Sequence, residues 1–218
     1  MAHVTAAGVP VLNGALTLPR QGAWHALLVL DTDEAPSGSI TIDWGGRQWT
    51  GTIYASRVER GVSVVQAVGG AGGLKAKVTA QGFRDAKVSA VFDHIANASG
   101  EALSSNIDAA LLARKFEWFP LLAGLAGRCL DTIAGVLGTA WRFEPDGKLW
   151  VGEEKWPKAA IDNADIELID LEGPTDRVRV RMLDPSLMPG TVWDGLRVSR
   201  VEHTVAADDL STLVWFER

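Results

Sequence analysis

Residues 141–152, Trp-Arg-Phe-Glu-Pro-Asp-Gly-Lys-Leu-Trp-Val-Gly, constrain the fold more than any other stretch of the chain. Two short apolar runs flank the polar segment Glu144-Pro145-Asp146-Gly147. Pro145 presets φ for a type I turn, and Gly147 can adopt the left-handed conformation of the bulge that follows such a turn. The stretch therefore predicts a β-hairpin whose apolar residues pack, and it carries no catalytic pattern.

Two amphipathic helices are predicted upstream of this hairpin. Residues 125–137 place their apolar side chains on one helical face, and Gly138 is a suitable end for that helix. An earlier helix follows Asp85, which we expect as its N-cap, and Gly100 lies beyond its end. Residues 101–119 give mixed signals. We expect a long connection there, with a short strand near 113–118 that ends at Pro120.

The residues before Asp85 favour strands separated by turns. Ile40, Ile42 and Trp44 alternate with polar residues, which is typical of a half-buried strand. Asn13-Gly14 signals a turn or bulge within an apolar run, and 57–60 is expected to be a polar connection. Short strands at this spacing favour a barrel or sandwich. The expected strands are 9–18, 23–30, 40–44, 48–55, 62–68 and 75–80.

The last part of the chain returns to strand patterns, at 166–171, 177–182, 196–205 and 212–216. We therefore predict an α+β, β-rich fold in three parts. Residues 1–84 form a β-barrel part, 85–155 form an inserted α/β module of two helices and a hairpin, and 156–218 form a second β-rich part that closes the first or forms a further barrel.

Composition excludes some classes of function. The chain has 218 residues and a formal net charge of −6, which argues against a nucleic-acid-binding surface but not against a protein that DNA passes without sticking. Its one cysteine, Cys129, permits no internal disulfide and has the spacing of a buried apolar residue. We find no signal peptide or membrane-spanning run and expect the protein to be made in a cytoplasm.

The glycine cluster 69–73 invites comparison with a phosphate-binding loop. Such a loop needs Gly-Lys-Ser/Thr at the start of a helix, whereas here Leu74 separates Gly73 from Lys75 and no hydroxyl residue follows the lysine. The expected structure is a tight loop where backbone approaches backbone. Gly70, Gly72 and Gly73 are accordingly candidate subunit-interface residues rather than cofactor ligands.

No catalytic, cofactor or metal site is predicted. Asp31, Asp33 and Glu34 are closely spaced but lie in an expected solvated turn without further acidic ligands nearby. The histidines lack metal-ligand spacing, and no Gly-x-Ser-x-Gly motif is present.

Two features of the last part are further interface candidates. Arg177, Arg179 and Arg181 share one face of a predicted strand. This row of arginines is interpreted as a solvated edge strand, as an inter-subunit row of ion pairs or as a DNA contact. The ion-pair interpretation takes its carboxylates from Asp165, Glu167, Asp208 and Asp209. Met188 and Trp193 lie in a Pro/Gly-rich loop and either dock a partner or pack on their own core.

A resemblance to a known family rests on several segments in a fixed order: 16–24, 51–54, 68–74, 137–152, 198–203 and 214–217. In these segments the chain resembles the baseplate hub, or tail-tip hub, proteins of contractile-tailed, Mu-like bacteriophages, nearly from end to end. None of the segments is a catalytic motif, so the likeness lies in their co-occurrence.

The resemblance implies tail-tube-like β-barrel parts with an α/β insertion. It also implies a trimer, in which two barrel-like parts per subunit imitate a six-fold ring between the hexameric tail tube and the trimeric spike. The implied partners are the spike, tail tube, distal tail and tape-measure proteins, with DNA only as transient cargo and no membrane insertion. The expected location is the virion tail, after assembly in the cytoplasm of the bacterial host.

Two other classes of function stay open at this point. One is a carbohydrate- or peptidoglycan-cleaving tail enzyme, which would need a cleft with paired carboxylates. The other is a binding module that recruits partners through Met188 and Trp193. Neither has a sequence signature as extensive as the hub resemblance.

Overall fold

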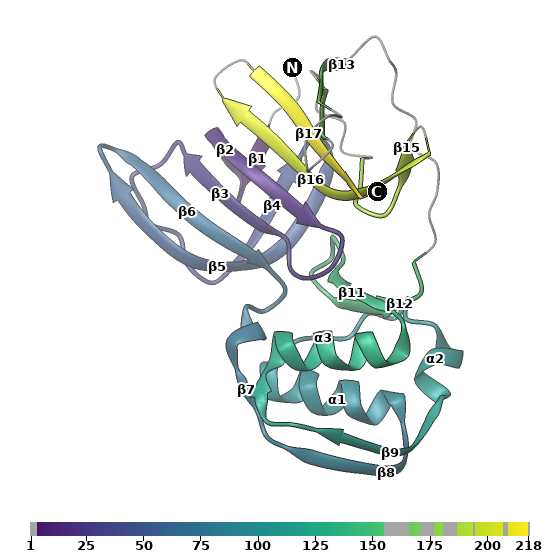
Figure 1. Ribbon diagram of the computed structural model, residues 1–218. Helices are drawn as coiled ribbons and strands as arrows, with labels where there is room; N and C mark the ends of the chain where they lie inside the picture. Colours follow the sequence, from purple (N-terminus) through teal and green to yellow (C-terminus); the bar gives the residue numbers. More distant parts are fainter. Residues whose placement is uncertain are drawn as a thin grey trace.

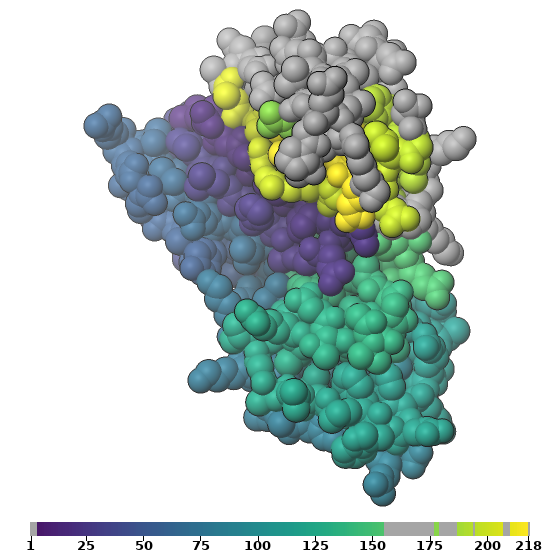
Figure 2. Space-filling view, in the orientation of Figure 1, coloured from purple at the N-terminus to yellow at the C-terminus, as the bar shows by residue number. Residues whose placement is uncertain are grey.

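The computed structural model describes residues 4–154, 166–170, 177–180, 187–193, 195–206 and 209–217. An N-terminal barrel and the C-terminal strands lie next to each other, and a helical module lies below both (Figure 1). In the space-filling view the module forms a lobe of its own under the strand-rich part (Figure 2). The β-rich architecture with an α/β insertion agrees with the predicted fold class.

Six antiparallel strands close into a barrel at the N-terminal end. Their order is β1-β4-β5-β6-β3-β2, and β2 returns to pair with β1. The alternation predicted from Ile40, Ile42 and Trp44 is confirmed, because these three side chains of β4 are buried and their neighbours are not. The bounds are β1 Val4–Ala6, β2 Val9–Pro19, β3 His25–Leu30, β4 Ser39–Trp44, β5 Arg47–Glu59 and β6 Val62–Gly69.

Local turn chemistry explains where these strands bend. The bulge signal at Asn13-Gly14 is confirmed, since the register of β2 against β3 shifts between Val11 and Asn13. The expected polar connection at 57–60 is wrong. β5 continues to Glu59, paired with Val62 of β6, and the chain turns only at Arg60-Gly61, where both φ values are positive. Pairing with β6 therefore overrides the polar composition of this segment.

The α/β module packs two helices against each other and against short strands. In Figure 1 the two-stranded β8–β9 sheet covers the side of α1 that faces away from the barrel. The predicted hairpin is confirmed as β11–β12, with Gly147 at φ 79° and its N–H bonded to the carbonyl of Glu144. The bounds are η1 Gly73–Lys75, β7 Lys77–Val78, β8 Gln81–Lys87, α1 Val88–Ser99, α2 Ala109–Ala113, β9 Lys115–Leu121, β10 Gly124–Leu125, α3 Ala126–Leu137, β11 Ala140–Phe143 and β12 Leu149–Gly152.

Two predictions in this module are wrong. Asp85 is not a helix cap: it lies inside β8 at φ 48°, and α1 begins three residues later, after Lys87. Pro120 does not end its segment but lies within β9, opposite Gly82. In the described part of the chain β9 pairs only with β8, so a residue without an N–H is tolerated there. The predicted helix ends at Gly100 and Gly138 are confirmed by positive φ values.

The C-terminal strands extend the sheet of the barrel. β16 pairs with β2 from Asn13 to Pro19, and β17, β14 and β13 follow in that order. Within the described residues, these strands do not close into a second barrel. The bounds are β13 Ile166–Asp170, β14 Arg177–Val180, β15 Val192–Trp193, β16 Leu196–Ala206 and β17 Asp209–Glu217.

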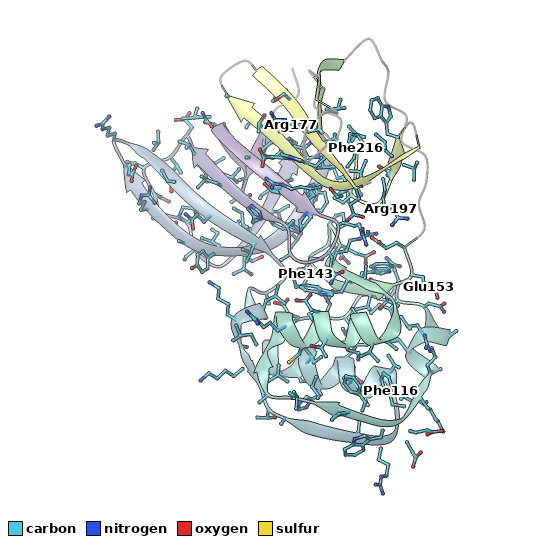
Figure 3. The ribbon with its side chains drawn as sticks, viewed as in Figure 1. Phe116, Phe143, Glu153, Arg177, Arg197 and Phe216 are labelled. Atoms are coloured by element: carbon cyan, nitrogen blue, oxygen red, sulfur yellow. The ribbon has the colours of Figure 1, made fainter. Side chains whose placement is uncertain are left out.

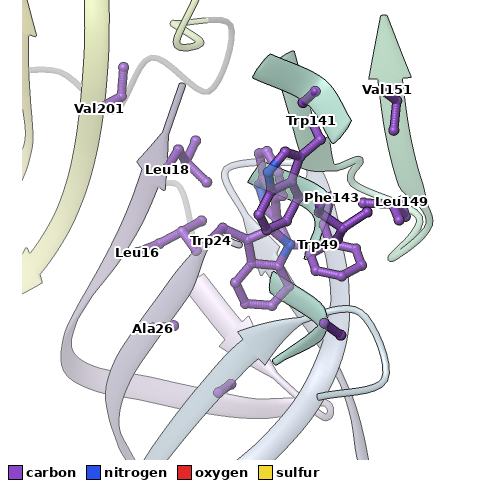
Figure 4. Packing of buried hydrophobic residues seen from close by; sticks show 14 of the residues in the cluster. Leu16, Leu18, Trp24, Ala26, Trp49, Trp141, Phe143, Leu149, Val151 and Val201 are labelled. Carbon is purple, nitrogen blue, oxygen red and sulfur yellow. The ribbon is translucent and has the colours of Figure 1, made fainter. Parts of the chain in front are cut away.

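A tryptophan-rich core joins the barrel to the module (Figure 4). Trp24 and Trp49 meet edge to face with their ring centres 6.1 Å apart, and both are buried. The Trp24 ring lies across Gly51 and Gly69, and the Cβ of Phe143 is close to Gly69. The absence of side chains at these two glycines lets the indole lie flat on the sheet.

Gly51→Ala is expected to lower the free energy of unfolding by about 2–3 kcal/mol, as overpacking does in well-packed cores. A Cβ at this position would overlap the carbonyl oxygen of Val68 and lie 2.7 Å from the Trp24 ring. Urea denaturation measures the effect. The control is Gly135→Ala in α3, where a Cβ meets nothing within 4 Å, and where the change should instead raise stability by up to about 1 kcal/mol.

Candidate functional site

A buried carboxylate fastens the glycine-rich loop to the module. Glu101, just after α1, is 6 % exposed. Its two oxygens accept the backbone N–H groups of Ala71 at 2.7 Å and Gly73 at 2.8 Å. The loop amides that could hold a phosphate are therefore occupied by a side chain of the same protein. This arrangement fits the absence of a Gly-Lys-Ser/Thr motif.

Backbone and indole hydrogen bonds complete this joint. The N–H of Gly22 donates to the carbonyl of Trp141 at 2.9 Å, and the N–H of Thr50 donates to that of Pro145 at 2.7 Å. The indole N–H of Trp141 donates to Asp131 at 2.8 Å. The hairpin β11–β12 is thus hydrogen-bonded to the barrel on one side and to α3 on the other.

An ion-pair network links all three parts of the chain. Arg20, just after β2, contacts Glu154 at 2.9 Å and also pairs with Glu217 of β17. Arg142 of β11 lies 3.8 Å from the same Glu154 and stacks over the Trp150 ring at 4.6 Å. Burial raises the pKa of Glu154, and the two arginines oppose that shift. Figure 3 places Glu153 and Arg197 on facing sides of this joint.

The sheet itself is the largest structural feature shared by the two β-rich parts. Adjacent residues run across it in register, from Glu202 of β16 through Thr17 and His25 to Val68 of β6 and Thr52 of β5. One curved sheet therefore passes from the C-terminal strands into the barrel wall without a break.

This sheet has an open edge at each end within the described residues. β5 pairs with β4 up to Thr52, and the N–H of Ile53 still donates to the carbonyl of Gly38 at 2.8 Å, so Ala55–Glu59 pairs with β6 alone. At the other end β13 pairs with β14 alone. An unpaired strand edge presents free N–H and C=O groups and is a ready site for pairing with another chain.

The outward face of this sheet is mostly small and uncharged. One central row contains Thr204, Ala15, Leu27, Gln66 and Ala55, with Ser211 buried at its β17 end. The other contains Ala206, Asn13, Val29 and Val64 and ends at the exposed Arg57 of β5. Charged side chains lie toward both ends of the face: Arg57 on β5, and Arg200 on β16, which contacts Glu202 at 2.8 Å. Thr17 donates to the same carboxylate at 3.2 Å.

The glycines predicted at an interface lie at the joint inside the chain. A Cβ on Gly70 would overlap Glu101 and Phe143, and one on Gly73 would overlap the carbonyl of Ser99. The close backbone approach predicted for this loop is therefore present. Gly72 is exposed. A role of these glycines between subunits stays a prediction.

The other interface candidates lie on the C-terminal strands. Arg177 is exposed on β14, opposite Trp215, and Arg179 follows in the same strand. Arg181 and the side chain of Arg179 lie outside the described residues, as do the carboxylates proposed to pair with them. Met188 and Trp193 are half-buried against the core, and Trp193 stacks on Phe216 with ring centres 5.5 Å apart. These two residues therefore pack on their own core, and a docking role for them is a prediction.

A hollow of about 580 Å³ lies beside α2 and β12. Asp108 and Glu153 are the carboxylates that line it, together with Arg114, Arg142 and Trp150. Asp108 is engaged as the N-cap of α2, where it accepts the N–H of Ala110 at 2.8 Å. In the part of the chain that the structure describes, no three His, Cys, Asp or Glu side chains gather. Cys129 is buried as predicted, and burial raises the pKa of its thiol.

Sequence reasoning missed the residues that hold the joint together. Glu101 lies in a segment of mixed signals, and nothing local indicates that its carboxylate meets the glycine loop. The pairing of β2 with β16 joins residues about as far apart as the chain allows, and strand patterns carry no information on such partners. None of the described helices is long and apolar enough to cross a membrane.

Glu101→Ala is expected to lower the free energy of unfolding by about 2–3 kcal/mol, because it leaves two loop N–H groups without their acceptor. Glu101→Gln retains one acceptor oxygen and should cost less. Chemical denaturation of the whole chain measures both. Glu153→Ala, which removes an exposed carboxylate just beyond β12, is the control and should change stability by less than about 0.5 kcal/mol.

The free energy of unfolding should depend on pH through His25, which lies on the outward face of the sheet. Partial burial, and then the charge of Arg200, lower the pKa of His25, whereas Glu202 opposes the shift. The unfolded chain keeps the ordinary pKa of about 6.5 and binds the proton first as pH falls, so stability decreases below that pH. In urea denaturation His25→Gln should lose less stability than the wild type between about pH 7.5 and pH 5.5. An unchanged pH dependence would contradict this assignment, and Arg200→Gln should give an intermediate result.

Comparisons with known proteins place the fold. No family model and no curated protein sequence matches the chain. Among solved structures, it is similar to the 43 kDa tail protein of prophage MuSo2 from Shewanella oneidensis, with a TM-score of 0.73 and 10 % identity over 99 % of this chain and 97 % of that one. A tail protein from Neisseria meningitidis MC58 gives a TM-score of 0.66 and 14 % identity over 99 % and 96 % of the two chains.

A third similar structure is the E. coli c3393 protein, with a TM-score of 0.62 and 10 % identity over 98 % of this chain and 76 % of that one. That protein is described as a component of the type VI secretion system with structural similarity to the T4 bacteriophage tail proteins gp27 and gp5. The likeness extends over nearly the whole chain, both β-rich parts and the module included. The protein therefore has the fold of these phage tail proteins.

Proposed function

We propose that this chain is the subunit of a ring-forming baseplate or tail-tip hub, which links the tail tube to the central spike. The observation that carries the proposal is the single sheet with an open edge at each end. Pairing the free edge of β5 with the β13 end of a neighbouring subunit joins copies head to tail, and a head-to-tail contact that closes forms a ring. The tail-protein fold supports this assignment.

The proposed oligomer is a trimer. Each subunit contributes two β-rich parts to one sheet, so three subunits present six such parts around the ring. This count matches a six-fold tube on one side and a three-fold spike on the other, as the resemblance to hub proteins implies. The glycine loop and the row of Arg177, Arg179 and Arg181 are proposed contacts within this assembly.

The proposed ring lets DNA pass without binding it. The chain has a formal net charge of −6, and the outward face of its sheet is mostly uncharged in the described rows. A phosphate backbone binds through clustered Lys and Arg, and this face presents no such cluster in those rows. A lumen lined mainly by Lys and Arg would overturn this part of the proposal.

The proposed partners follow from that position. They are the spike on one side, the tail tube, distal tail and tape-measure proteins on the other, and DNA as transient cargo. The protein acts in the virion tail of a contractile phage after assembly in the bacterial cytoplasm. A carbohydrate-cleaving enzyme is not favoured, because Asp108 in the hollow beside α2 is engaged as a helix cap.

The oligomeric state tests the proposal. Size-exclusion chromatography with light scattering measures the molar mass of the chain, alone and mixed with spike and tube proteins. We expect the chain to be a trimer. Val58→Lys places a charge on the open edge of β5, where Val58 is 45 % exposed, and edge lysines oppose strand addition. We expect this variant to be monomeric with unchanged stability. Leu27→Lys, on the exposed face of a central strand, is the control and should remain trimeric. A wild-type chain that stays monomeric with its partners would refute the hub.

A further inference from the structure

An exposed tryptophan lies on the two-stranded β8–β9 sheet, on the side away from α1. Trp118 is 58 % exposed and pairs across the strands with Arg84, whose guanidinium carbon is 5.9 Å from the ring centre. A Cβ on Gly82 would overlap the same ring, so the indole lies over this glycine. The ring is therefore held in place on the sheet with much of its surface open to solvent.

The opposite side of the β8–β9 sheet packs against the module. Phe83 and Phe119 form a cross-strand pair, both buried, and Phe116 stacks on Phe119 with ring centres 4.8 Å apart. Figure 3 places Phe116 between the β8–β9 sheet and the helices. Because the inner face is packed, Trp118 belongs to a rigid surface rather than to a loop.

Besides Arg84, two lysines lie at one end of this sheet. Lys87 and Lys115 are directly opposite each other across the two strands, and both are exposed. Like charges in this position destabilise a sheet unless something neutralises them. None of the ion pairs within the described part of the chain involves Arg84, Lys87 or Lys115.

The rest of the β8–β9 sheet adds two acids and an apolar end. Asp85 and Glu117 are exposed on the same two strands, and Leu122, just after β9, is 77 % exposed. The surface thus combines an aromatic centre, a cationic end and an apolar end, on a protein whose net charge is −6. We name it the Trp118 face, made of Gly82, Arg84, Lys87, Lys115, Trp118 and Leu122.

We propose that the Trp118 face docks an extended, acidic segment of a partner protein. Apolar side chains of this segment cover Trp118 and Leu122, and its carboxylates neutralise Arg84 and the opposed lysines. β8 and β9 pair only with each other in the described part of the chain, so a free edge is available for an added strand. Tryptophan and arginine are the residues most enriched among those that dominate protein interfaces.

The charges on this surface favour a protein partner over a nucleic acid. The carboxylates of Asp85 and Glu117 on the same strands would repel a phosphate backbone, whereas a protein segment can place its acids and apolar residues selectively. The Trp118 face lies at the end of the molecule opposite the barrel (Figure 1), away from both open edges of the large sheet. The inference therefore goes beyond the proposed ring and holds whether or not the ring forms.

Selection from a displayed library of random peptides against the whole chain tests the proposal. We expect the enriched peptides to be rich in Asp and Glu alternating with apolar residues. Their affinity, measured by fluorescence anisotropy, should fall at least about tenfold in Trp118→Ala and in the double variant Lys87→Glu/Lys115→Glu. It should also fall with added salt. Lys148→Glu, which changes the same charge in the β11–β12 turn, should bind as the wild type does.

Three results would overturn the proposal. One is a selection that yields no peptides, or peptides without acidic enrichment. Another is duplex DNA or heparin binding that the same variants abolish, which makes the surface a polyanion site. The last is wild-type self-association that Trp118→Ala removes, which makes the occupant a second copy of the chain. Unfolding curves of each variant separate lost binding from lost folding, and Trp118→Ala should unfold like the wild type because its ring is exposed.

Discussion

The arrangement of this protein depends on one strand, β2, that serves two partners along the same edge. Its first residues pair with β1 and close the barrel, and the stretch from Asn13 to Pro19 pairs with β16. The bulge between Val11 and Asn13 lies where the partner changes. Without this change of partner β2 would offer no edge to β16, and the C-terminal strands would have no sheet to extend. A closed barrel abolishes strand edges, whereas this shared strand moves them to the two ends of a longer sheet.

The contacts that hold the module to this sheet require glycine at several positions, because any larger side chain would collide there. Trp24 lies flat because Gly51 and Gly69 have none, and the carboxylate of Glu101 reaches the loop amides past Gly70. Ion pairs of Arg20 and Arg142 with Glu154 cover the exposed side of the same joint. Packing, buried hydrogen bonds and surface charge therefore all act at one place, where the three parts of the chain meet.

Sequence reasoning succeeded where structure is decided locally. The turn at Pro145-Asp146-Gly147, the helix ends at Gly100 and Gly138 and the alternation in β4 depend on neighbouring residues, and all were predicted. It failed where a distant partner decides. Residues 57–59, two of which are charged, are strand because β6 lies beside them, and Pro120 is strand because β9 has a free side. Glu101, the anchor of the joint, looks like an ordinary polar residue in sequence.

The contact of Glu101 with the glycine loop also bears on how the protein could be divided. The loop comes from the end of the barrel and the carboxylate from the module, so each half holds only one side of the same buried hydrogen bonds. A barrel expressed by itself would have two bare amides next to an uncovered Trp24, and a module expressed by itself would have an unpaired carboxylate. Cutting between them would leave both fragments with polar groups that water must satisfy. The boundary that looks natural in the ribbon is thus a poor place to divide the chain, and the two parts should melt in a single calorimetric transition.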